Sequence, residues 1–129
     1  ALRAIQAVAM PDGVPRNYLQ YCRNYLNQLG DDCISPAVKQ EIETIARAVD
    51  NSDWQPVICH HDMVPQNIIE NARGVTIIDW EYAALGHPDL DFMRLFGADL
   101  SATGEQENIL LPLFKLQQAM DKLWLAVQL

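Results

Sequence analysis

The sequence lacks several features that define whole classes of protein. No apolar run approaches the roughly 18–20 residues that a membrane-spanning helix needs, and the longest, NILLPLF, is broken by Pro112. The cysteines number 3 and show no Cys-x-x-Cys spacing, which indicates reduced thiols in a cytoplasmic protein rather than a disulfide framework. Basic residues are few, 9 against 17 acidic ones, so the net charge is −8. These absences argue against a membrane or a nucleic acid as partner.

The N-terminal segment also lacks the marks of a leader. ALRAIQAVAMPDG has no initiator Met and no cationic stretch followed by a long apolar core, so it is not typical of a secretory signal. It is typical of the end of a helix whose start is absent. With 129 residues, half of them apolar, the chain has the composition of one globular domain. We therefore expect residues 1–129 to form a single domain that is a fragment of a longer protein.

Helical periodicity dominates both ends of the chain. Apolar residues recur every three or four positions there, which is typical of helices with one buried face. Ser35 followed by Pro36 is typical of a helix start, and Pro112 divides the last periodic segment into one kinked helix or two. The expected helical segments are residues 2–9, 18–29, 36–49, 88–98 and 104–128.

The period changes between residues 56 and 82. The short runs PVIC, NIIE and VTIID are typical of strands, and NARG between the last two supplies turn chemistry. There is no room for a crossover helix, so the last two strands must pair antiparallel. The sequence therefore predicts an α+β fold that is mainly helical and contains a small antiparallel β-hairpin.

Two polar loops flank the predicted hairpin. The first, CHHDMVPQN, carries Asp62 and Asn67, and the second begins at Asp79, which closes a run rich in Val and Ile. If the hairpin brings the loops together, these three side chains converge. Their oxygens suit Mg²⁺, which prefers one or two carboxylates completed by phosphate oxygens. One carboxylate is then left to take a proton from a hydroxyl, as phosphoryl transfer requires.

Two other interpretations of the first loop are open at this point. One is a transition-metal site of a metallohydrolase, whose donors would be typical of zinc or iron sites: His60, His61, Asp62 and His87. Adjacent histidines in an extended segment point to opposite faces, however, so both do not easily bind one ion. The other interpretation is a polar turn without chemistry, with Asp79 and Glu81 as ordinary loop acids.

Two motifs on these loops resemble those of a known family. HHDMVPQN fits the pattern His-x-Asp-x-x-x-x-Asn, and VTIIDWEYAALGHPDLD resembles a metal-binding segment followed by Gly-x-Pro-x-x-Asp at the next helix. Both motifs, in this order, resemble the aminoglycoside phosphotransferase and choline kinase family of kinase-fold enzymes. The Trp-Glu-Tyr run after Asp79 is more similar to choline, ethanolamine and thiamine kinases than to the antibiotic-modifying branch. The specific part of the resemblance covers residues 60–91.

The resemblance implies a role for each matching position. Asp62 would be the catalytic base that accepts the proton of the acceptor hydroxyl. Asn67 and Asp79 would hold the Mg²⁺ that bridges the phosphates of ATP, and Glu81 is a further candidate at the metal. His60 would support the loop structurally. Asp91 would anchor the catalytic loop through backbone hydrogen bonds. His61 occupies a position that varies in the family, so the resemblance implies no role for it.

The same resemblance implies what the chain is and does. It would be the C-terminal lobe of a protein-kinase-like fold, because a Gly-rich phosphate loop and a strand with an ATP-contacting Lys are absent from the sequence. The function implied is transfer of phosphate from ATP, with Mg²⁺, to a hydroxyl of a small molecule. Choline-, ethanolamine- or thiamine-like alcohols come first and aminoglycosides second. We expect the isolated chain to be inactive, and self-association is conceivable through the face left by the missing lobe. A non-catalytic kinase-like binding module is the alternative.

Overall fold

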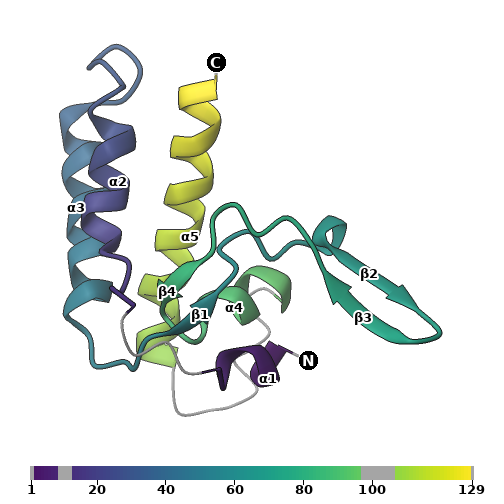
Figure 1. Cartoon of the computed structure of the whole chain (residues 1–129). Helices are drawn as coiled ribbons and strands as arrows, with labels where there is room; N and C mark the ends of the chain where they lie inside the picture. Colours follow the sequence, from purple (N-terminus) through teal and green to yellow (C-terminus); the bar gives the residue numbers. More distant parts are fainter. Residues whose placement is uncertain (1, 9–12, 97–106, 129) are drawn as a thin grey trace. The chain divides into compact units, whose positions relative to one another are not determined.

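The computed structural model describes residues 2–8, 13–96 and 107–128. Figure 1 shows the order of the elements along the chain. The helices are α1 (Leu2–Gln6), α2 (Tyr18–Leu26), α3 (Pro36–Asn51), α4 (Leu90–Phe96) and α5 (Glu107–Gln128). The strands are β1 (Val57–Cys59), β2 (Ile68–Asn71), β3 (Gly74–Ile77) and β4 (Ala84–Gly86), and a 3₁₀ turn, η1, spans Pro65–Asn67. The predicted fold class, mainly helical with a small antiparallel hairpin, is confirmed.

Contacts divide the chain into two compact units. Residues 1–16 and 54–102 belong to the first unit, and residues 17–53 and 103–129 belong to the second. The first unit contains the strands and both polar loops, and the second is purely helical where it is described. None of the described helices is long and apolar enough to cross a membrane. The prediction of a single domain over residues 1–129 stays a prediction.

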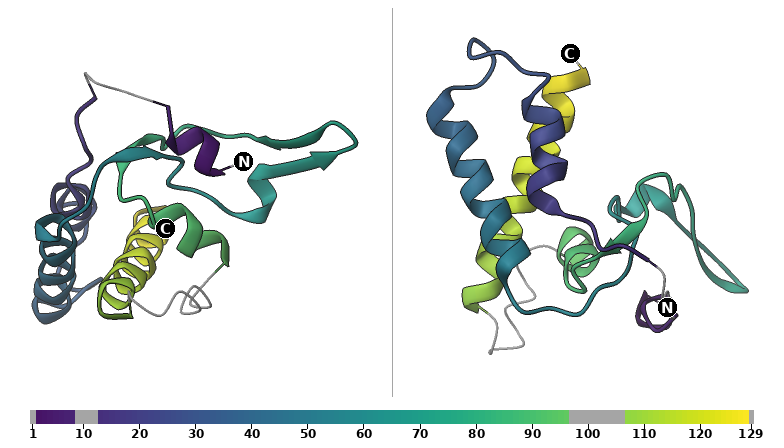
Figure 2. Two further views of the ribbon diagram at one scale, coloured as in Figure 1. Left: turned by 90° about the horizontal axis from the view of Figure 1, so that it is seen from below. Right: turned by 60° about the vertical axis from the view of Figure 1, so that its left-hand side comes forward.

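Three helices, α2, α3 and α5, form the second unit and run alongside one another (Figure 2). Each buries the apolar stripe that its periodicity predicts. Pro112 lies inside α5, where it removes one helical hydrogen bond, and residues 107–128 nevertheless form one helix. The buried apolar side chains are Tyr18, Cys22 and Leu26 of α2, Ile42, Ala46 and Val49 of α3, and Leu113, Leu116, Ala119, Met120 and Leu123 of α5.

Polar side chains fix where the helices of this unit begin. Ser35 accepts a hydrogen bond from the backbone N–H of Val38 at 3.3 Å and precedes Pro36, as predicted. The start of α2 is capped by Asn17, whose side chain accepts from the N–H of Gln20 at 2.8 Å.

A carboxylate from α3 completes the cap of α2. Asp50 accepts from the backbone N–H groups of Tyr18 and Leu19 at 2.8 and 2.9 Å. An anion at a helix N-terminus is favoured by both the free N–H groups and the helix dipole. The same charge adds to burial in raising the pKa of the Cys22 thiol to about 12.

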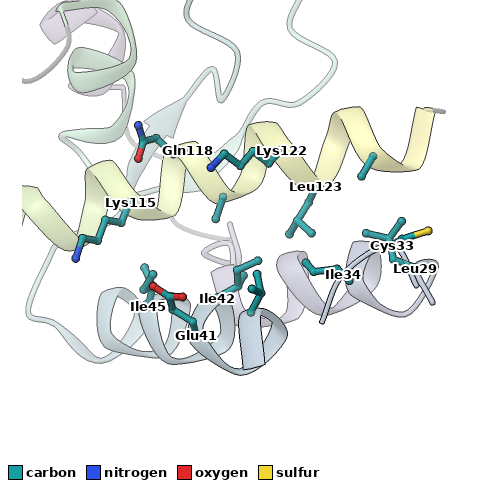
Figure 3. Close-up of a pocket in the computed structure, with 13 residues that line it drawn as sticks. Leu29, Cys33, Ile34, Glu41, Ile42, Ile45, Lys115, Gln118, Lys122 and Leu123 are labelled. Atoms are coloured by element: carbon teal, nitrogen blue, oxygen red, sulfur yellow. The ribbon is translucent and has the colours of Figure 1, made fainter. Parts of the chain in front are cut away.

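An open groove of about 420 Å³ runs along the surface of the second unit (Figure 3). Its floor is apolar and comes mainly from α3 and α5, with Lys115, Lys122 and Glu41 among the residues that line it. None of the side chains assigned to catalysis or metal binding from the sequence lines this groove.

Two antiparallel pairs of strands form the sheet structure of the first unit. In the hairpin, β2 pairs with β3 from Ile68↔Ile77 to Asn71↔Gly74. The turn is closed by Asn71, whose side chain accepts from the N–H of Arg73 at 2.8 Å, and by Gly74, whose φ of 129° suits glycine. The predicted antiparallel pairing is therefore confirmed. Figure 1 shows the hairpin extending beyond β1 and β4.

Strand β4 was not predicted from the sequence. It pairs antiparallel with β1, from Val57↔Gly86 to Cys59↔Ala84. Its three residues, Ala-Leu-Gly, have neither the length nor the alternation of a recognisable strand. Strand β3 ends at Ile77, so Asp79 lies two residues beyond the strand that it was expected to close.

Helices α1 and α4 also belong to the first unit. The side chain of Gln6 donates to the backbone oxygen of Pro88 at 2.9 Å, and the guanidinium of Arg3 lies 4.2 Å from the centre of the Phe92 ring. Helix α4 begins at Leu90, two residues later than expected. The expected end of the first helix at residue 9, the expected helix end near residue 98 and the expected helix start at residue 104 lie outside the described residues.

We predict that Asp50→Ala lowers the free energy of unfolding by about 1–3 kcal/mol, because two N–H groups lose a charged acceptor. Urea unfolding followed by circular dichroism measures the change. Asp53→Ala, at an exposed acid of the same unit, is the matched control and should change the value by less than about 0.5 kcal/mol. Equal effects of the two substitutions would contradict the role of Asp50 as a cap.

Candidate active site

The first polar loop is anchored by Asp91, a carboxylate from the first turn of α4. Asp91 is only 1% exposed. Its two oxygens accept from the backbone N–H groups of His60, at 2.6 Å, and of His61, at 3.0 Å. Burial raises the pKa of this carboxyl, whereas the two hydrogen bonds act in the opposite direction. The contact is of the kind that the family resemblance implies for Asp91.

His60 connects this loop to the end of the hairpin. Its Nδ1 lies 3.1 Å from the backbone N of Asp62, and its Nε2 lies 2.8 Å from the carbonyl oxygen of Ile78. The pattern assigns a neutral ring in which Nδ1 accepts and Nε2–H donates. The ring also meets Trp80 edge to face, with centroids 4.8 Å apart. Both nitrogens of His60 are therefore engaged with backbone groups.

Asp62 and Asn67 lie together on the loop. The amide Nδ2 of Asn67 donates to the backbone oxygen of Asp62 at 2.8 Å and to its carboxylate Oδ2 at 3.1 Å. Asn67 is buried, and these bonds fix the orientation of its amide. The acceptor oxygen Oδ1 lies on the opposite side of the amide from Nδ2 and takes no part in these two bonds. Asp62 keeps its second carboxylate oxygen for another partner.

The metal-binding segment predicted after the hairpin starts beside this pair. Ile78 donates its N–H to the carbonyl oxygen of Asn67 at 2.9 Å and accepts from His60 through its own carbonyl. Asp79 follows directly and has a φ of 65°, in the left-handed region that few residues other than glycine adopt. Its side chain and that of Glu81 are exposed. The hairpin thus brings the backbone of Asp79 next to the loop of Asp62.

The donor chemistry suits a hard cation better than a transition metal. Among the described residues, no three His, Cys, Asp or Glu side chains gather as a metal site. His60 has no nitrogen left for a metal, which argues against the alternative built on His60, His61, Asp62 and His87. A Mg²⁺ site needs only an amide oxygen and a carboxylate from the protein when phosphate oxygens supply other ligands, so Asn67 and Asp79 fit such an ion.

His61 has a structural position that the sequence did not reveal. Its φ is 65°, and His, Asn and Asp are the residues enriched in this region. Burial, assisted by the charge of Arg16, lowers the pKa of its imidazole to about 3, against hydrogen bonds with the backbone of Tyr82 and Cys59. The ring is therefore neutral at pH 7 and lies between the first loop and the segment after Asp79.

The remaining histidine and the buried cysteine belong to the packing beneath the site. His87 Nδ1 accepts from the N–H of Asp89 at 3.1 Å, just ahead of α4, and its ring lies 5.3 Å from Trp54. The Sγ of Cys59 donates to the carbonyl oxygen of His87 at 3.1 Å. Burial raises the pKa of Cys59, so its thiol stays protonated and unreactive.

We predict that Asp91→Asn lowers the free energy of unfolding by about 1–3 kcal/mol. The amide can accept from one of the two N–H groups, but its own NH₂ faces the other. Thermal or urea unfolding measures the loss, with Asp53→Asn as the exposed control. A change as small as that of the control would show that Asp91 does not anchor the loop.

The pH dependence of stability should report on His61. Its folded pKa lies below the unfolded value, so its contribution is complete above about pH 6.5 and is lost as the pH falls toward 3. Between pH 7 and pH 5 the loss is about 2 kcal/mol. His61→Asn, which tolerates the left-handed backbone, should lose less stability over this interval. Parallel stability curves for the two proteins would refute the assignment.

Comparisons with known proteins agree with the motifs. Comparison with curated proteins finds no match. The structure is similar to choline kinase LicA from Streptococcus pneumoniae, with 21% sequence identity, a TM-score of 0.71 and coverage of 98% of this chain and 52% of that one. It is also similar to a choline/ethanolamine kinase family protein from Mesorhizobium loti, with 16% identity, a TM-score of 0.67 and coverage of 98% and 51%.

At these identities the likeness shows the fold, which is that of choline kinase-like proteins, and the chain spans about half the length of the two solved chains. A sequence model of the phosphotransferase enzyme family matches residues 1–125. The family predicted from the two loop motifs is therefore confirmed, and the chain belongs to the phosphotransferase enzyme family.

Proposed function

We propose that this chain carries the catalytic loop of a kinase that transfers the γ-phosphoryl group of ATP, with Mg²⁺, to a hydroxyl of a small molecule. The observation that carries the proposal is the pairing of Asp62 with Asn67, at 2.8 and 3.1 Å, on a loop fixed by Asp91. Phosphoryl transfer depends mainly on a positioned hydroxyl and on charge stabilisation. A held carboxylate beside an oriented amide oxygen suits both tasks.

In this proposal each polar residue has one task. Asp62 orients the acceptor hydroxyl and takes its proton through the carboxylate oxygen that Asn67 does not contact. Asn67, through Oδ1, and Asp79 hold Mg²⁺, and Glu81 is a further candidate ligand. Bound Mg²⁺ would neutralise charge on the phosphates of ATP. His60 keeps the two loops in register by its hydrogen bonds to Asp62 and Ile78.

The acceptor proposed is an alcohol of the choline, ethanolamine or thiamine type, with aminoglycosides as the second choice. The Trp-Glu-Tyr run after Asp79 supports this order, as do the two solved neighbours, described as a choline kinase and a choline/ethanolamine kinase family protein. An aromatic ring near the site could hold a quaternary ammonium group. Trp80, which is 37% exposed, presents such a ring beside His60.

We further propose that residues 1–129 act as the larger lobe of a longer protein. A nucleotide-binding lobe would complete the ATP site, so the chain alone would not turn over ATP. A cytoplasmic location, where ATP is available and the cysteines stay reduced, goes with this proposal. Self-association of the isolated chain through the face left by that lobe also remains a prediction. Only the longer protein therefore tests the proposed function.

We predict that Asp62→Asn lowers kcat for phosphoryl transfer in the longer protein by about 10²–10⁴-fold, which is the usual contribution of a general base. The assay uses ATP, Mg²⁺ and a panel of small alcohols and aminoglycosides. Nucleotide affinity should change little, because Asn67 and Asp79 remain in place.

The matched control is Asp53→Asn, which removes one negative charge at an exposed position and should leave kcat unchanged. Transfer to one acceptor that is lost in Asp62→Asn alone would establish the reaction and its base. Transfer to none of the acceptors, together with no Mg²⁺-dependent binding of ATP, would favour the non-catalytic binding module instead.

A further inference from the structure

Arg16 contacts both strand β4 and the loop that leads into it. Its backbone N–H donates to the carbonyl oxygen of Leu85 at 2.7 Å, and the neighbouring Pro15 forms a parallel bridge with the same residue. Its guanidinium Nη2 donates to the carbonyl oxygen of Tyr82 at 3.2 Å. A charged donor makes a stronger hydrogen bond than a neutral one. Arg16 thus holds the segment that begins three residues after Asp79, together with the His61 ring and the pairing of β4 with β1.

The backbone around Asp79 depends on such flanking contacts. On one side, Ile78 is held by the catalytic loop through both its N–H and its carbonyl oxygen. On the other side, the turn is closed locally, with the N–H of Ala83 donating to the carbonyl oxygen of Trp80 at 3.0 Å. The bond from Arg16 spans 66 positions in the sequence and connects this turn to a distant segment of the first unit.

Asp79 needs that support because of its own conformation. A non-glycine residue in the left-handed region carries backbone strain and persists when the surrounding structure determines it. Asp79 has a φ of 65°, and its exposed side chain forms none of the hydrogen bonds or ion pairs found among the described residues. Its direction is therefore set by the backbone on either side.

Arg16 and His61 of the first loop both contact the backbone of Tyr82. Burial is the main reason for the low pKa of His61, and the positive charge of Arg16 is the next cause. The same charge acts on Cys59, the last residue of β1. Arg16 therefore shares a backbone partner with the first loop and bonds directly to the segment after Asp79.

We propose that Arg16 is a positioning residue, which holds the turn after Asp79 so that the Asp79 carboxylate points to the divalent cation. This inference rests on the proposed function. In this proposal Arg16 acts through the turn and not on the acceptor or the phosphates. Its loss therefore weakens cation binding and leaves the affinity for the acceptor unchanged, whereas a purely structural role would lower stability alone.

The test measures cation binding without turnover, in the longer protein. Mn²⁺ replaces Mg²⁺, ADP is present, and the electron paramagnetic resonance signal of free Mn²⁺ gives the dissociation constant. We expect Arg16→Ala to raise this constant about tenfold, within the range typical of residues that orient a metal ligand. Asp79→Asn removes the proposed ligand and should abolish the site, which shows that the signal reports it.

Three further variants separate positioning from folding. Arg16→Lys keeps a charged donor and should restore most of the affinity. Arg16→Gln keeps a shorter neutral donor and should lie between Lys and Ala, which gives a usable series if the alanine variant does not fold. Arg23→Ala is the matched arginine control, since Arg23 pairs with Glu43 at 3.1 Å in the helical unit. It should leave the Mn²⁺ constant unchanged, and the thermal midpoint of every variant is measured alongside.

The outcomes distinguish this inference from the proposed function. An affinity for Mn²⁺ that falls from wild type through Arg16→Lys and Arg16→Gln to Arg16→Ala, and that is unchanged in Arg23→Ala, supports the positioning role. Equal affinity across the Arg16 series, or an equal loss in Arg23→Ala, overturns it while the proposed function stands. If the wild-type protein binds Mn²⁺ neither with nor without ADP, the proposed function fails and this inference falls with it.

Discussion

The whole site depends on the contact between the Asp91 carboxylate and two successive backbone N–H groups. Two neighbouring N–H groups converge on one anion either at the start of a helix or where the backbone leaves regular secondary structure. The φ of 65° at His61 places this contact in the second class. Burial raises the pKa of this carboxyl, and the two N–H donors act in the opposite direction by favouring its charged form. With His60 and His61 fixed, Asp62 is presented at the end of β1 in one orientation.

Short hydrogen bonds connect the loop that Asp91 anchors to the segment after the hairpin. His60 bonds to the backbone of Asp62 with one nitrogen and to Ile78 with the other. Asn67 bonds to Asp62 with its side chain and to Ile78 with its carbonyl oxygen. Ile78 is therefore the position at which the catalytic loop meets the segment of Asp79. His60 and Asn67 thus connect two loops that would otherwise be independent. In the proposed function, this connection keeps the base and the cation ligands at a fixed separation.

The sequence predicted the parts of this arrangement that local chemistry determines. Helical periodicity, the Ser35–Pro36 cap and the turn at Asn71–Gly74 are local, and each is present in the structure. Strand β4 could not be predicted, because its pairing with β1 depends on residues nearly thirty positions away. The left-handed backbone of His61 and Asp79, and the bond from Arg16 to Tyr82, also arise from contacts across distant segments. The motifs indicated which residues carry the proposed chemistry, whereas the contacts that hold these residues in place form only in the tertiary structure.

The two residues with left-handed backbone, His61 and Asp79, differ in how firmly their surroundings hold them. His61 is largely buried, its N–H binds Asp91, and its ring contacts the backbone of Tyr82 and Cys59. Its strained conformation is therefore overdetermined by packing. Asp79 has the same φ but is exposed, so only its neighbours hold it. A change in the first unit should therefore alter the conformation of Asp79 more readily than that of Asp62. That asymmetry is the physical basis of the proposal that Arg16, which lies outside both motifs, affects cation binding and leaves Asp62 unchanged.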